Sequence, residues 1–201
     1  MHSRLHRHPT HTSTAAGRSR ARGTSLIEFV LVLPLLLIMI LGLIEFGSLI
    51  QSRLIVANVA REGASIASRT LTLDNSIANL IAVSGHPLVL NGAYGKVVIT
   101  RITAGQVGKI TPSITGTFSA GSLGQASSIA AGNANLGLPA NLYQHLVFKT
   151  NRPAPGVDGA DVNEMTVVEV FYKYMPITPL FNFVPGLVPK SGQLLKSRAI
   201  F

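Results

Sequence analysis

The sequence predicts an α+β fold in which a long N-terminal helix packs on a small antiparallel sheet. The first observation is an uncharged apolar block, Phe29 to Ile44, that runs directly into an amphipathic pattern with no proline before Pro87. The second is a set of short stretches rich in β-branched and aromatic residues, separated by segments rich in glycine and serine. We therefore expect three parts: a basic leader over 1–23, a helix over 24–69 and an outer α+β domain over 70–201.

The apolar block is long enough to cross a membrane. With its apolar flanks it covers about 25 residues, and a helix needs about 20 to cross the hydrocarbon core. Glu28 and Glu45 would lie about 26 Å apart along such a helix, close to the two interfaces. Glu45 could there pair with a neighbour's arginine or face headgroups and water. Pro34 predicts a kink, or is simply a residue that membrane helices tolerate.

Charge around the block predicts its orientation. Five arginines and no acid precede Glu28, and the nearest of these arginines are Arg18, Arg20 and Arg22. The positive-inside rule then places the N-terminus in the cytoplasm and residues from Gln51 onward outside. A cleaved secretory signal is a weaker alternative, because no A-x-A-like site ends the apolar run.

Composition argues against several functions. The net charge of +9 falls to +4 without the five leader arginines, since twelve basic and eight acidic residues remain. This remainder contains no run of basic residues, which argues against nucleic-acid binding. With no cysteine, disulfides and thiolate chemistry are excluded. Asp158, Asp161 and Glu164 lack the glycine-centred spacing of a calcium loop. We expect no enzyme, no metal, no cofactor and no small-molecule substrate; the leader histidines suggest a tail rather than a metal site.

The helix is expected to continue as a stalk from the span to about Arg69. Its apolar stripe would pack on the chain's own domain or on other subunits, and it consists of Leu49, Ile50, Leu54, Ile55, Val56, Val59, Ala60, Ala64 and Ala67. Arg61 and Glu62 fall off this stripe, as a solvated patch or as a subunit contact.

The outer domain should begin with a short helix within 71–83, starting near Asp74 or Asn75. Strands are predicted over 96–103, 144–150 and 165–174. The long stretch 104–142 suggests loops with a short helix near 127–131, and 151–159 suggests a turn.

The junction of leader and helix carries the most specific signal. A carboxylate so near the start of a membrane helix is costly unless it is paired. Cleavage after Gly23 would give Thr24 a free amine that could pair with Glu28 within a subunit or between subunits. Such a pair would penalise wrong axial registers, because a wrong register leaves a charge unpaired.

The residues of this junction resemble a known family. Gly23 followed by TSLIEF looks like the class III signal of type IV pilins. The longer string RGTSLIEFVLVLPLLLIMILGLIEFG, followed by ANVAREGA, resembles the TadE-like pseudopilins of the tight-adherence (Flp, type IVb pilus) system. The resemblance covers about 22–69, with a weaker similarity at VVEVFYKYMPITPL near the C-terminus.

The resemblance implies a processing and assembly pathway. A prepilin peptidase would cut between Gly23 and Thr24, and Glu28 would serve processing or assembly. The single-pass protein of a bacterial inner membrane would then join or help build a surface pilus for adhesion or secretion, with other pilin subunits and the assembly machinery as partners. Two alternatives stay open: an uncleaved anchor that displays a binding or sensory domain, and a membrane-tethered enzyme with an unrecognised site.

Overall fold

A computed structural model describes residues 18–150, 159–179 and 191–201, and the side chains from Thr24 onward. The chain divides into two units, Met1–Leu43 and Ile44–Phe201, each of which is described by itself. The leader histidines and most of the turn expected over 151–159 fall outside the described residues.

A single helix, α1 (Arg18–Arg69), runs through both units and is helical through Pro34. The predicted long helix is confirmed, and it starts several residues before the expected Thr24. Within the first unit, all side chains from Thr24 to Leu37 are exposed. In the second unit, the helix gains one buried face.

The second unit contains a four-stranded antiparallel sheet with the order β2-β1-β3-β4. Its strands are β1 (Gly95–Thr103), β2 (Ser113–Ala120), β3 (Glu164–Tyr174) and β4 (Gln193–Ile200). The two central strands match the predicted ones, which confirms the α+β fold. Both edge strands are additions to the sequence-based prediction.

The predicted strand over 144–150 is wrong. A helix, α3 (Ala140–Leu146), occupies its first residues, and Lys149 forms only an isolated bridge with Gly159. Leu142, Tyr143 and Leu146 share one face at helical spacing and pack into a core, and this burial outweighs the local β-preference. The helix expected near 127–131 is also wrong. The hydroxyls of Ser127 and Ser128 there donate hydrogen bonds to the sheet, and a short 3₁₀ turn, η1 (Ala134–Gly137), follows later in the chain.

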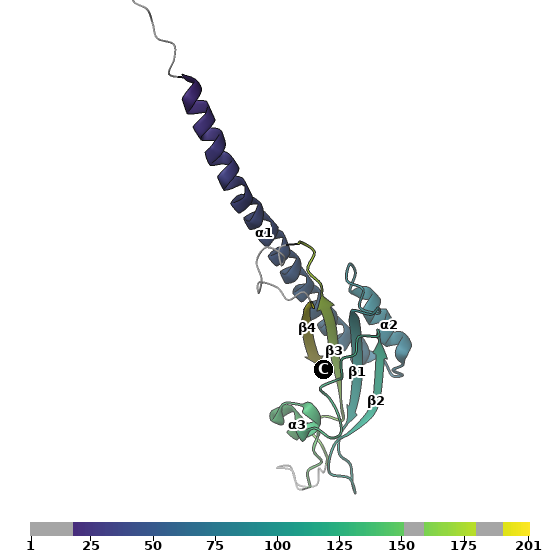
Figure 1. The fold of residues 1–201 in the computed structure, drawn as a ribbon. Helices are drawn as coiled ribbons and strands as arrows, with labels where there is room; N and C mark the ends of the chain where they lie inside the picture. Colours follow the sequence, from purple (N-terminus) through teal and green to yellow (C-terminus); the bar gives the residue numbers. More distant parts are fainter. Residues whose placement is uncertain (1–17, 151–158, 180–190) are drawn as a thin grey trace, which may run out of the picture. The chain divides into compact units, whose positions relative to one another are not determined.

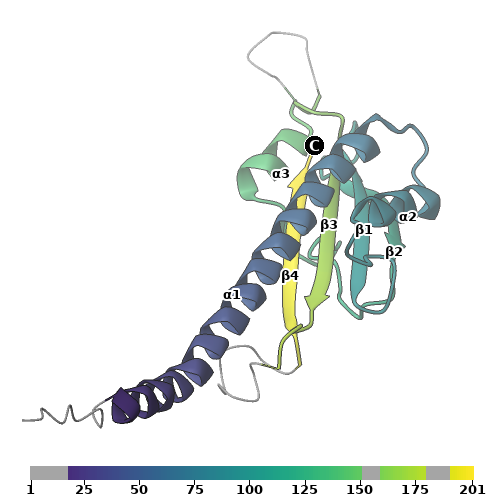
Figure 2. The ribbon, with the colours of Figure 1, turned by 90° about the horizontal axis from the view of Figure 1, so that it is seen from above.

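One face of the sheet is covered by α1 and α2 (Asn75–Ser84), which lie on the same side in Figure 2. Asp74 caps α2 by accepting a hydrogen bond from the backbone nitrogen of Ile77, as the sequence predicts. The α1 side of this core is built from small and β-branched residues, namely Val56, Val59, Ala60, Ala64 and Ala67. Small side chains allow the helix backbone to approach its neighbours closely.

The apolar stripe predicted for the stalk is partly corrected. Ile50 and Leu54 are exposed, so they do not belong to the buried face. The buried face starts with two polar residues, Glu45 and Ser52, which are seven positions apart. It continues with Val56, four positions after Ser52. Periodicity alone assigns polar residues to the solvent side, so it could not find these two.

The opposite face of the sheet is covered by the chain between β1 and β3. Its core is formed by Ile102, Ala104, Ile129, Leu136, Leu138, Leu146, Met165 and Val167. This stretch was expected to be loops, and its apolar residues are too widely spaced along the chain to show a periodicity.

Arg101 of β1 binds the C-terminal end of α1. Its guanidinium donates to the carbonyl oxygens of Thr70 at 2.6 Å, Leu71 at 2.9 Å and Ala67 at 3.4 Å. The last carbonyls of a helix have no partner within the helix, so a cation there supplies donors and complements the helix dipole. Glu164 lies 3.9 Å from the arginine Nε. The end of the stalk is thus fixed to the sheet.

Two glycines of α1 give a direct test of this packing. A Cβ atom at Gly63 would lie 2.6 Å from Cγ2 of the buried Ile81, whereas one at Gly47 would meet nothing within 4 Å. We expect Gly63→Ala to destabilise the protein by about 1–3 kcal/mol through overpacking. Gly47→Ala is the matched control and should raise stability by up to about 1 kcal/mol, because alanine favours a helix. Urea unfolding of the full chain in detergent, followed by circular dichroism, measures both; equal effects would contradict the close approach of α2.

Candidate functional site

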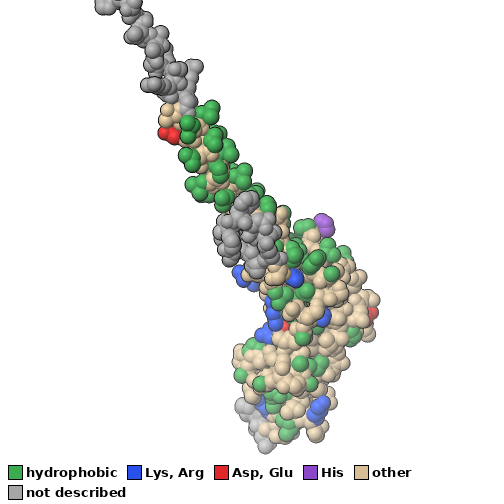
Figure 3. All heavy atoms as spheres, in the orientation of Figure 1, with side chains coloured by type: hydrophobic (Ala, Val, Ile, Leu, Met, Phe, Trp, Pro, Cys, Tyr) green, Lys and Arg blue, Asp and Glu red, His purple; other side chains and the backbone are tan. Residues whose placement is uncertain are grey.

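The first candidate site is the apolar part of α1. Among the described residues, one helix is long and apolar enough to cross a membrane, and none of the residues in its most apolar window is buried. Figure 3 shows hydrophobic side chains, in green, along the visible face of this part of the helix. A helix that is apolar on all sides needs an apolar environment, which the described part of the chain does not supply. The helix is therefore suited to a bilayer or to other helices; its orientation stays a prediction.

The residues of the predicted processing junction lie in the first turns of α1. Gly23 and Thr24 are both helical, so a peptidase would have to unwind the helix to bind this bond extended. Glu28 is exposed on the apolar helix. Arg18, Arg20 and Arg22 lie in the same helix, but their side chains are outside the described part. Cleavage, register and topology remain predictions for these residues.

The second candidate site is a cage of donors around Glu45, whose side chain is only 3% exposed. Its Oε1 accepts a hydrogen bond from the hydroxyl of Tyr174 at 2.7 Å. Its Oε2 accepts from the hydroxyl of Thr178 at 2.8 Å and from the backbone nitrogens of Thr178 at 2.9 Å and Ile177 at 3.2 Å. Four donors from the end of β3 and the turn after it thus converge on one carboxylate.

This cage fixes α1 to the C-terminal part of the sheet domain. Its members lie 129 to 133 positions apart in the chain, and hydrogen bonds to a carboxylate are stronger than neutral ones. Burial and the hydrogen bond to Glu45 both raise the pKa of Tyr174, so its hydroxyl stays a donor. The sequence had placed Glu45 beside a neighbour's arginine or headgroups, whereas the structure surrounds it with its own chain. No sequence signal links it to Tyr174 and Thr178.

A second buried carboxylate, Glu169, lies on the opposite face of the sheet and was missed. It accepts hydrogen bonds from the hydroxyls of Ser127 and Ser128, and Lys196 lies 3.4 Å away. Burial alone would raise the pKa of Glu169, but these hydrogen bonds and the lysine outweigh burial and hold the pKa below its usual value. This carboxylate fastens the long connection between β2 and α3 to the sheet.

The other residues singled out from the sequence lie apart from both cages. Arg61 and Glu62 are exposed on the stalk, which leaves their role in a subunit contact a prediction. Asp161 accepts from His145 at 2.9 Å and Lys149 at 3.0 Å, and Asp158 is outside the described residues. Within the described ranges, no group of three or more His, Cys, Asp or Glu side chains could hold a metal.

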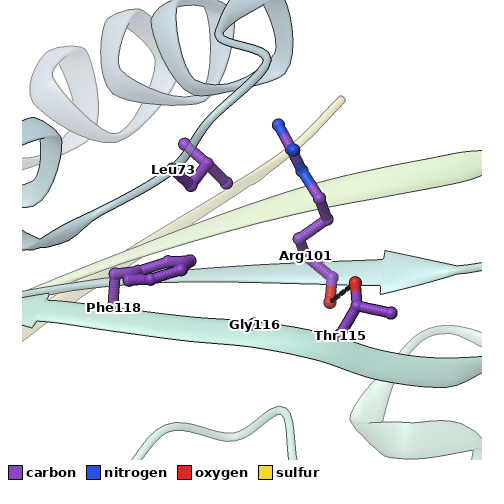
Figure 4. A pocket seen from close by; sticks show the side chains of 5 residues that line it. All are labelled: Leu73, Arg101, Thr115, Gly116 and Phe118. Atoms are coloured by element: carbon purple, nitrogen blue, oxygen red, sulfur yellow. Dashed lines mark hydrogen bonds between the residues drawn. The ribbon is translucent and has the colours of Figure 1, made fainter.

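A hollow of about 250 Å³ lies between Arg101, Leu73, Thr115, Gly116 and Phe118, and Figure 4 shows its lining. Its one charged group is Arg101. The carbonyl of Arg101 accepts a hydrogen bond from the Thr115 hydroxyl, and its guanidinium already donates to three carbonyls at the end of α1. The hollow thus presents no uncommitted acid, base or nucleophile among its lining residues.

The Glu45 cage leads to a stability prediction. Glu45→Ala would leave two hydroxyls and two backbone nitrogens without an acceptor, and each buried unsatisfied group costs about 1–3 kcal/mol. We expect a loss of at least about 3 kcal/mol, against less than about 0.5 kcal/mol for the exposed control Glu62→Ala. Urea unfolding of both full-length variants in detergent measures the difference, and equal losses would refute the cage.

Comparison with known proteins gives one match. No curated protein and no solved structure shows significant similarity to the chain. The TadE-like protein family model matches residues 23–65, which contain Gly23, Thr24, Glu28 and Glu45 as well as the exposed apolar part of α1. The match covers 43 of the 201 residues, so the chain is similar to the TadE-like protein family over its N-terminal helix.

Proposed function

We propose that this protein is a pilin-like structural or assembly subunit of a tight-adherence pilus, cut by a prepilin peptidase after Gly23. The observation that carries the proposal is the coincidence of the family match with the unburied apolar helix. A helix of this kind can pass from lipid into a bundle of like helices, because both environments are apolar. TadE-like proteins are associated with the Tad pilus machinery, which provides the class of partner.

The stalk offers further support for contacts between subunits. Phe46, Ile50 and Leu54 follow one another at four-residue spacing, and their side chains are 53%, 57% and 59% exposed. They form an apolar stripe on the side of α1 that the sheet leaves uncovered. We propose that this stripe packs against a neighbouring subunit in the assembled fibre, beside Arg61 and Glu62.

Glu28 has the role of a register residue in this proposal. Its exposed carboxylate would pair with the amine that cleavage creates on Thr24, within one subunit or between neighbours. The alternative function is that of an uncleaved anchor for a binding domain. In that case Gly23 would have no role in cleavage and Glu28 no role in register.

The mature N-terminus tests processing directly. In cells with an active prepilin peptidase, intact-mass and N-terminal analysis of the membrane fraction should find Thr24 as the first residue. Gly23→Leu should abolish the cut, because a bulky side chain hinders close approach of the protease to the backbone. A mature chain that still begins at Met1 would refute the proposal and favour the uncleaved anchor.

Glu28 and Glu62 give a matched pair for assembly. We expect Glu28→Ala to insert into the inner membrane normally but to be lost from sheared surface fibres by at least tenfold. Glu62→Ala, an equal change at an exposed glutamate outside the apolar segment, should change the fibre fraction less than twofold. Quantitative blotting of both fractions measures this, and normal fibre levels for Glu28→Ala would remove its role in register.

A further inference from the structure

One end of the sheet exposes apolar side chains that the fold does not use. This is the end at which β1 and β4 begin and β2 and β3 finish. Its exposed residues are Val89, Tyr94, Met175, Ile177 and Leu194, which are 39% to 68% exposed. We call these five residues the proximal surface.

Backbone pairing places these residues close together. The nitrogen of Lys173 donates to the carbonyl of Tyr94 at 2.7 Å, and Lys173 is the register partner of Leu194 in the β3–β4 pair. Met175 and Ile177 follow in the turn after β3, and the Ile177 nitrogen donates to Glu45. The proximal surface is therefore built from three segments held together by main-chain hydrogen bonds and by the Glu45 cage.

The proximal surface also lacks an exposed negative charge. Across the described segments at this end of the sheet, 44–50, 86–96, 119–123, 172–179 and 191–194, the one acid is Glu45, which is buried. The half-buried Lys173 lies within the surface. Apolar and aromatic side chains beside a lysine are typical of groups that settle at the boundary of headgroups and acyl chains.

Connectivity brings this surface to the membrane. Glu45 accepts a hydrogen bond from the Ile177 nitrogen. It is the second residue of its unit and directly follows the apolar block, which ends at Ile44. If that segment spans the bilayer, Glu45 lies at the interface, and the turn bonded to it cannot be far from the headgroups. We propose that the proximal surface rests on the lipid bilayer that α1 crosses, with Ile177 and Met175 inserted at the level of the headgroups.

This proposal rests on the membrane placement in the proposed function but not on processing or pilus assembly. It makes the sheet domain an interfacial body rather than a domain held away from the membrane by a stalk. The opposite end of the sheet provides a matched control, because Val107 and Ile110 are 86% and 61% exposed there without any link to the apolar segment.

The chain contains no tryptophan and no cysteine, so a single introduced tryptophan reports its own environment. We would reconstitute three full-length variants, Ile177→Trp, Ile110→Trp and Leu36→Trp, into phosphatidylcholine–phosphatidylglycerol vesicles. Lipids brominated near the headgroup end of the chains quench from the membrane side, and iodide quenches from water. Leu36 lies within the apolar segment and reports whether the anchor is inserted.

We expect brominated lipid to quench Ile177→Trp at least twofold, with blue-shifted emission and weak iodide quenching. Ile110→Trp should show the reverse. If Leu36→Trp is quenched by lipid while Ile177→Trp behaves like Ile110→Trp, the proximal surface does not rest on the bilayer and the proposal is wrong.

Two further outcomes are distinguishable. Failure of lipid to quench Leu36→Trp would contradict the membrane placement itself and would overturn the proposal along with it. Blue-shifted emission of Ile177→Trp that depends on protein density, without lipid quenching, would identify another subunit as the occupant and would also overturn it. Should Ile177→Trp not fold, Met175→Trp and Leu194→Trp provide the same readout, because both lie on the proximal surface without donating to Glu45.

Discussion

The carboxylate of Glu45 marks the position at which one helix changes its environment. Before it, α1 has a long apolar segment whose most apolar window is not buried by any described residue; after it, one face of the helix is buried against a sheet. A charge at this boundary is stable only if it is solvated or supplied with donors. The end of β3 and the turn after it supply four hydrogen-bond donors to this carboxylate. The helix is therefore bonded, just after its apolar segment, to residues more than 120 positions away.

The rest of the second unit follows from holding that helix in place. Small residues let α1 and α2 lie close to the sheet, with Ile81 directly over Gly63. Arg101 of the sheet binds the C-terminal end of α1, and Glu45 of α1 binds the sheet domain where the helix enters the second unit. On the other face, Glu169 fastens the long connection by the same means, a buried carboxylate that accepts from hydroxyls. In a chain without cysteine, these charge-assisted hydrogen bonds link segments that are distant in sequence, as disulfides do in many small secreted domains.

The long helix, its apolar first half and the two central strands were predictable, because each is a local pattern of hydrophobic residues. The edge strands were not. β2 lies in a stretch rich in glycine, serine and threonine, and β4 carries Lys196 and Arg198, so neither looks like a buried strand. The strand predicted over 144–150 is wrong because the core contacts that favour a helix over 140–146 come from residues far away in sequence. The two carboxylate cages were missed for the same reason: a buried acid and a solvated one look alike in sequence, and its donors identify it only in three dimensions.

This arrangement bears on assembly. In the proposed function, the helix leaves the membrane for a fibre and must carry the outer domain along, and the Glu45 cage and the Arg101 contacts join helix and sheet within the second unit. The outer domain would then move with the helix as one body from Ile44 onward, since all these contacts lie within one unit.

A double-mutant cycle between Glu45 and Tyr174 tests this account most directly. The free energy of unfolding is measured for the full-length wild type, Glu45→Ala, Tyr174→Phe and the double variant. The account predicts a coupling energy of at least about 1 kcal/mol, because each single change leaves the other group without its partner. Additive effects within about 0.5 kcal/mol would show that the two residues do not interact and would contradict the Glu45 cage as the link between helix and sheet.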